Sequence, residues 1–140
     1  MNKIKFLHCD PWILMTIPIN KDGVDLEGII GRADAINHAI PTDEEIEGAI
    51  TRCLQANIIK KIDDKYVFTD NYLKIFDKLW EKSKNVFDMW KIVEEYLSKS
   101  DLKKMNSDEL KLKLNESSIA HKKYSETFWK MYKKIDQNKK

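Results

Sequence analysis

The stretch that decides the fold runs from Pro41 to Thr69 and reads PTDEEIEGAITRCLQANIIKKIDDKYVFT. Thr42 with Glu45 three residues later forms a capping box, which predicts that a helix starts here. Apolar residues then recur at helical spacing, so this helix has one buried face. Two short apolar segments follow, and the Asp63-Asp64-Lys65 sequence between them predicts the turn of a β-hairpin.

Two further helices are predicted upstream of this stretch. Asp10 followed by Pro11 supplies a cap and a residue suited to a first helical turn. Residues 20–23 have the composition of a turn, and Asp25 after them caps a helix that ends near Asn37. The predicted order over residues 10–69 is therefore helix, helix, turn, helix and two-stranded hairpin.

The second half of the chain is predicted to be helical. Helices start after Thr69 or Asp70 and after Asn85, and both are rich in large aromatic residues. Between residues 102 and 114, leucines alternate with lysines as in a strand, but Asn106 with Glu109 resembles a capping box, so we predict a helix there. A last helix carries an apolar stripe at helical spacing, made of Tyr124, Phe128, Met131, Tyr132 and Ile135.

The order of elements over residues 10–69 resembles that of winged helix-turn-helix regulators of the multiple-antibiotic-resistance and phenolic-acid-decarboxylase regulator types. The likeness is carried by Leu26, Ile29, Ile30, Thr42 through Leu54, Asn57-Ile58-Ile59 and Tyr66-Val67-Phe68-Thr69. It predicts a mostly α fold with a small two-stranded wing, an α+β winged helix-turn-helix followed by C-terminal helices. Residues 1–82 would form the winged-helix domain, and residues 83–140 a helical extension packed on the same core or in a dimer interface.

The resemblance implies that the chain is a transcription regulator that binds double-stranded DNA. In such proteins the third helix enters the major groove, the wing touches the backbone, and flanking helices form a homodimer. A helical wheel places Thr51, Arg52 and Gln55 on the outward face of the third helix. The predicted DNA contacts are these three residues together with the wing lysines Lys60, Lys61 and Lys65.

The charge of the predicted reading helix argues against DNA binding. Its first turns carry Asp43, Glu44, Glu45 and Glu47, whereas affinity for DNA comes largely from lysine and arginine at phosphates. Asp43 and Glu45 are explained by helix-start chemistry, but Glu44 and Glu47 are not. The chain has 23 lysines but only two arginines, and residues 1–70 carry a net charge of −4 against +6 for residues 71–140.

The alternative hypothesis is a winged helix adapted to bind another protein. Gly28, Gly31 and Ala35 form a small-residue stripe along the second predicted helix, where another helix could approach closely. The same stripe could also consist of exposed glycines without a role, and the sequence leaves both readings open. The predicted interaction surface consists of this stripe with Glu44, Glu47 and Gly48, and the lysine-rich last helix is its leading partner.

No sequence motif indicates an enzyme, and no catalytic residue, metal site or cofactor is expected. Cys9 and Cys53 lack metal-binding or disulfide spacing, which fits a reducing compartment. The chain shows neither a signal peptide nor an apolar run long enough to span a bilayer, so we expect a cytoplasmic protein without a membrane partner. A ligand-sensing or enzyme-accessory subunit that uses the aromatic C-terminal helices remains a third hypothesis.

Overall fold

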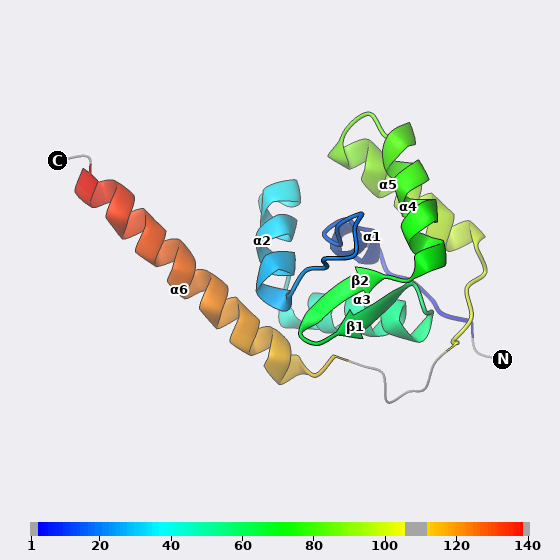
Figure 1. Ribbon diagram of the computed structural model, residues 1–140, viewed down its shortest axis with the longest axis horizontal. Coiled ribbons are helices and arrows are strands. Elements are labelled where there is room, and N and C mark those ends of the chain that lie inside the picture. Colours follow the sequence, from blue (N-terminus) through cyan, green and yellow to red (C-terminus); the bar gives the residue numbers. More distant parts are fainter. Residues whose placement is uncertain (1–2, 106–111, 139–140) are drawn as a thin grey trace.

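The computed structural model describes residues 3–105 and 112–138, in which six helices surround one two-stranded antiparallel sheet (Figure 1). The mostly helical α+β class predicted from the sequence is confirmed. The elements, in order, are α1 (Asp10–Leu14), α2 (Leu26–Asn37), α3 (Asp43–Gln55), β1 (Ile59–Ile62), β2 (Lys65–Phe68), α4 (Asp70–Lys82), α5 (Val86–Lys99) and α6 (Leu114–Asn138).

Three of the six described helices start at predicted capping residues whose side chains form the capping hydrogen bond. The Asp25 side chain accepts a hydrogen bond from the backbone N–H of Gly28, and Thr42 forms the expected reciprocal capping box with Glu45. Asn85 caps α5 in the same way. The predicted cap at Asp10 was wrong, because Asp10 is the first residue of α1 and its carboxylate is used elsewhere.

The hairpin pairs Ile59 with Phe68 and Ile62 with Lys65. Two residues in the left-handed region, Asn57 with φ 61° and Asp63 with φ 57°, turn the chain before and within it. Asn57 was predicted as such a residue. Figure 1 shows the hairpin beside α3, with α4 leaving from the end of β2.

One core joins both halves of the chain. Ile13 and Leu14 of α1 are buried together with Ile46 and Ile50 of α3. The same cluster contains Phe76, Met89, Val93, Leu97, Leu112 and Ala120 from the second half. Residues 83–99 and the start of α6 therefore share the core of residues 10–69.

The helix predicted between residues 102 and 114 is absent from the parts of that segment that the structure describes. Residues 102–105 are not helical, and Lys103 instead forms an isolated antiparallel bridge with Lys3. Residues 112–113 precede α6, which starts at Leu114, and Asn106 and Glu109 of the predicted capping box lie outside the described residues. Long-range pairing with the N-terminal segment replaces local helix formation at Lys103.

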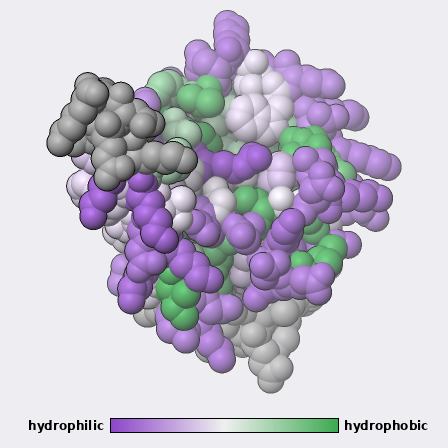
Figure 2. Space-filling model, turned by 60° about the vertical axis from the view of Figure 1, so that its left-hand side comes forward, coloured by the Kyte–Doolittle hydropathy of each residue, from purple (hydrophilic) through white to green (hydrophobic). Residues whose placement is uncertain are grey.

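Helix α6 has 25 residues and is the longest element described. Its first half packs against α2 and α3, and its second half projects beyond the rest of the molecule (Figure 1). On the side shown in Figure 2, hydrophilic side chains predominate and hydrophobic ones lie among them in separate patches. The projecting part of α6 has no neighbouring helix or strand in Figure 1.

Candidate protein-interaction surface

Arg52, predicted as a DNA contact, is bound to the core of the protein. Its Nε donates to Oδ2 of Asp10 at 2.6 Å and its Nη2 to Oδ1 at 2.7 Å, which makes a bidentate ion pair. The Asp10 side chain is fully buried, and the Arg52 side chain is 22% exposed. The helical wheel predicted that Arg52 points outward, but the structure turns it toward α1.

The environment of this pair explains why Arg52 is fixed. Burial alone would lower the pKa of Arg52, but the hydrogen bonds and charge of Asp10 raise it. The Asp10 carboxylate also accepts the backbone N–H of Leu7 at 2.8 Å. A Cβ atom added to Gly48 would lie 2.8 Å from Nη2 of Arg52, so the missing side chain leaves room for the guanidinium group to fold back.

A second flank of α3 is covered by the chain that leads into α6. The backbone N–H of Met105 donates to the carbonyl oxygen of Gln55 at 2.7 Å. The N–H of Leu112 donates to Oγ1 of Thr51 at 3.0 Å, and the Leu112 side chain is buried. The hydroxyl of Thr51, one of the predicted base-reading side chains, therefore binds the C-terminal segment of its own chain, whereas Gln55 binds that segment through its backbone carbonyl oxygen.

Asp43, at the start of α3, is the polar anchor for α6. Its two carboxylate oxygens accept hydrogen bonds from the Ser117 and Ser118 hydroxyls, each at 2.8 Å. The Nδ1 atom of His121 lies 2.5 Å from the same carboxylate. Burial would raise the pKa of Asp43, but these hydrogen bonds and the charge of His121 together lower it.

Little of α3 is left for an outside partner. Of its thirteen residues, all described, only Glu44 is exposed, whereas Glu47 and Gly48 are partly buried. On the hairpin, Lys60, Lys61 and Lys65 are all exposed, and Lys61 lies 3.5 Å from Glu116 of α6. The predicted DNA contacts therefore do not form one positively charged surface.

The glycine stripe of α2 meets the last helix at one position. A Cβ atom on Gly31 would lie 3.2 Å from the ring of Tyr124, whose hydroxyl donates to Asp34 at 2.8 Å. Gly28 instead lies against Val24 near its own helix start, and Ala35 is exposed. The expectation that α6 packs on α2 is thus confirmed, with Gly31 as the point of close approach.

Large apolar side chains are exposed on the projecting half of α6. Phe128, Trp129, Met131 and Tyr132 are each between 51% and 61% exposed. The rings of Phe128 and Trp129, and those of Trp129 and Tyr132, meet edge to face at 5.9 Å and 5.6 Å. Exposed apolar groups at this density mark sites of interaction with other molecules.

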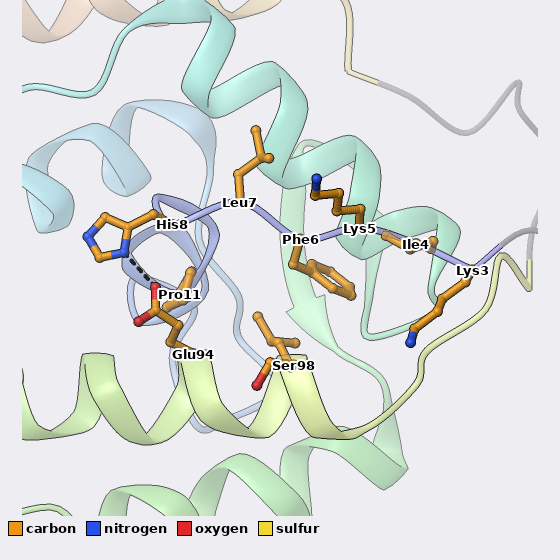
Figure 3. A pocket seen from close by; sticks show the side chains of 10 residues that line it. Lys3, Ile4, Lys5, Phe6, Leu7, His8, Pro11, Glu94 and Ser98 are labelled. Carbon is orange, nitrogen blue, oxygen red and sulfur yellow. Dashed lines mark hydrogen bonds and ion pairs between the residues drawn. The ribbon is translucent and has the colours of Figure 1, made fainter.

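A cavity of about 430 Å³ lies between the N-terminal segment and α5 (Figure 3). Apolar residues such as Phe6, Pro11 and Leu97 line it, and His8 Nδ1 lies 2.5 Å from Glu94 Oε2 at one end. The His8 ring stacks on Trp90, which stacks in turn on Trp12. These contacts attach the N-terminal segment to α5.

The described residues offer no reactive group for catalysis by a thiol. Burial, and after it the Asp10 carboxylate, raise the pKa of Cys9 to about 11, and burial raises that of Cys53 well above its ordinary value. Both thiols are therefore protonated at neutral pH. Among the described residues there is also no group of three potential metal ligands.

Comparisons with protein-family models, curated proteins and solved structures found no match. No helix in the described part of the chain is long and apolar enough to cross a membrane. We therefore infer function from the surface of the molecule.

Replacing Asp43 with alanine is expected to lower the free energy of unfolding by about 1–2 kcal/mol, because it removes three contacts to α6 and an acidic group at a helix N-terminus. Urea titration would measure the change. Glu44→Ala, next to it on the exposed side of α3, is the control and should change stability by less than about 0.5 kcal/mol. Equal effects of the two substitutions would show that Asp43 does not anchor α6.

Proposed function

We propose that residues 10–69 form a winged-helix unit that does not read DNA, and that the chain associates with protein, as a homodimer with a second copy of itself, through α6. The absence of DNA binding is supported by the side chains of α3, because other parts of the same chain already bind those expected to contact DNA. Asp10 binds the Arg52 side chain, the backbone N–H of Leu112 binds the Thr51 hydroxyl, and the residue of α3 that remains exposed is Glu44.

Electrostatics support the same conclusion. A helix in the major groove needs cationic or hydrogen-bonding side chains directed at phosphates and base edges. In this structure a helix approaching DNA with its exposed side would bring Glu44 toward the phosphates. The three exposed hairpin lysines, Lys60, Lys61 and Lys65, are too few to compensate for that repulsion and for the loss of Arg52.

The homodimer is supported by the apolar side of α6. The same side of the helix that packs against the protein also carries apolar residues that are exposed. Advancing 100° per residue puts Phe128 and Met131 on the same side of α6 as Ala120 and Tyr124. Ala120 is buried and Tyr124 packs against the core, whereas Phe128 and Met131 on the same side of α6 are more than half exposed. Among the described residues, the hydrogen bond between α6 and α2 that lies nearest the C-terminal end of α6 runs from the Thr127 hydroxyl to the Glu27 carboxylate.

The free stretch of this apolar face is a stripe along one helix, so the matching stripe of a second helix could cover it lengthwise. The α6 helix of a second copy, running antiparallel, would present the same face and give a closed two-fold pair. The exposed lysines Lys130 and Lys133 lie on the opposite side and stay in solvent.

Binding to a mixed-sequence DNA duplex, measured by fluorescence anisotropy at about 50 mM salt, tests the first part of the proposal. We expect no binding, because α3 presents no cationic face. The variant with Lys60, Lys61 and Lys65 replaced by alanine should behave like the wild type. Binding by the wild type that weakens steeply with added salt and is lost in the triple variant would instead support a DNA-binding regulator.

A further inference from the structure

The His121 ring is surrounded by hydrogen-bond acceptors on both sides. Its Nε2 lies 2.6 Å from the carbonyl oxygen of Pro41, in the loop before α3. Its Nδ1 lies 2.5 Å from the Asp43 carboxylate and 3.1 Å from the carbonyl oxygen of Ser117. The His121 side chain is only 23% exposed, so water cannot readily replace either contact.

The number of N–H donors that these contacts require determines the charge of the His121 ring. A neutral imidazole has one N–H donor and one nitrogen lone pair, whereas an imidazolium has two donors. Pro41 O, Ser117 O and the Asp43 carboxylate can only accept, and the nearby hydroxyl, Ser117 Oγ at 3.5 Å from Nδ1, already donates to Asp43. If either nitrogen lost its proton, a lone pair would face an oxygen less than 3 Å away, and one contact would become repulsive.

We propose that His121 is a pH-dependent latch, which in its doubly protonated form holds α6 to the start of α3 and releases it as the ring becomes neutral. Histidine is the side chain whose charge ordinarily changes between about pH 5 and 8. This inference does not depend on the proposed homodimer or on the absence of DNA binding.

The charged groups around the latch come from three elements. Asp43 of α3 is the one in direct contact with the ring. On α2, Asp34 is bound by the Tyr124 hydroxyl, one turn further along α6. On α6 itself, Lys122 and Lys123 are exposed and oppose a positive ring, but they follow it directly in the sequence and point into solvent.

Release of the latch would affect two surfaces together. The segment from Leu112 to His121 covers the flank of α3 that contains Thr51, so its detachment would expose that flank. The same movement would free α6 from α2, where Tyr124 contacts Gly31. The C-terminal helix would then be docked at low pH and loosened at high pH, as expected for a cationic group that loses its partner on deprotonation.

Hydrogen exchange of the α6 amides in the full-length protein tests the latch. Protection factors, which correct for the intrinsic pH dependence of exchange, are compared at about pH 6 and about pH 8.5. We expect the protection of residues 117–124 to fall roughly tenfold at the higher pH, the value of one lost hydrogen bond to a charged group. His121→Gln, which cannot titrate, should abolish this pH dependence, and His38→Gln, at an exposed histidine that ends α2, should retain it.

Two results would overturn the proposal. One is equal protection of α6 at both pH values in the wild type, and the other is an unchanged pH dependence in His121→Gln. If His121→Gln detaches α6 altogether, the test is the protonation of the two His121 ring nitrogens in the wild-type protein. Nitrogen-15 spectra should show both ring nitrogens of His121 protonated at about pH 6, and a singly protonated ring in the docked state would exclude the latch.

Discussion

Arg52→Ala is expected to lower the free energy of unfolding by about 3–5 kcal/mol, because it leaves the Asp10 carboxylate buried without a counter-charge. That loss is a large part of the total stability of a domain of this size, so the variant should unfold at much lower urea concentration. Asp10→Ala should also destabilise the protein, since it removes the partner of a guanidinium group that is largely covered.

The matched control is Arg32→Ala, the same substitution at the only other arginine of the chain, which is exposed on α2. It should change the free energy of unfolding by less than about 0.5 kcal/mol. If Arg52→Ala were as mild as Arg32→Ala, the ion pair with Asp10 would not support the core, and Arg52 would again be available to a partner.

Phe128→Asp or Met131→Asp is expected to weaken self-association by roughly 30-fold or more, the effect of losing a central interface residue worth about 2 kcal/mol. Each substitution places a charge in the apolar face that α6 would present to a second copy. Sedimentation velocity over a range of concentrations measures the shift from dimer to monomer. Both side chains are more than half exposed in the single chain, so its fold should be unaffected.

Ile119→Asp separates this effect from a general loss of hydrophobicity. Ile119 is 55% exposed on the same helix, but the wheel places it away from the face that contains Phe128 and Met131. It should leave the dissociation constant within about twofold of the wild type. A comparable loss of association in Ile119→Asp would place the interface on another side of α6.

The helix and hairpin elements could be predicted because their signals are local. The Thr42–Glu45 box, the Asp25 and Asn85 caps and the left-handed Asn57 each act over a few residues, and the structure confirms all four. The stripe in the last helix was likewise visible at its 3.6-residue period. Its packing on α2 followed from the small residues of that helix and from charge complementarity.

The role of Arg52 could not be predicted because it depends on contacts between distant residues. A wheel for α3 shows which side faces away from the core, but it does not show that α1 lies over Arg52 on one flank. It also does not show that Leu112, 61 residues later, bonds Thr51 on the other. One feature of the sequence does indicate this role of Arg52: the chain has only two arginines beside 23 lysines. A buried bidentate ion pair requires a guanidinium group, which lysine cannot replace.

Self-association through the free face of α6 is tested by sedimentation equilibrium of the wild-type protein, because the method reports mass independently of shape. We expect a reversible monomer–dimer equilibrium in which the mass rises with concentration from the monomer value of 16.5 kDa to twice that value. A mass that stays at 16.5 kDa at every concentration would rule out the homodimer.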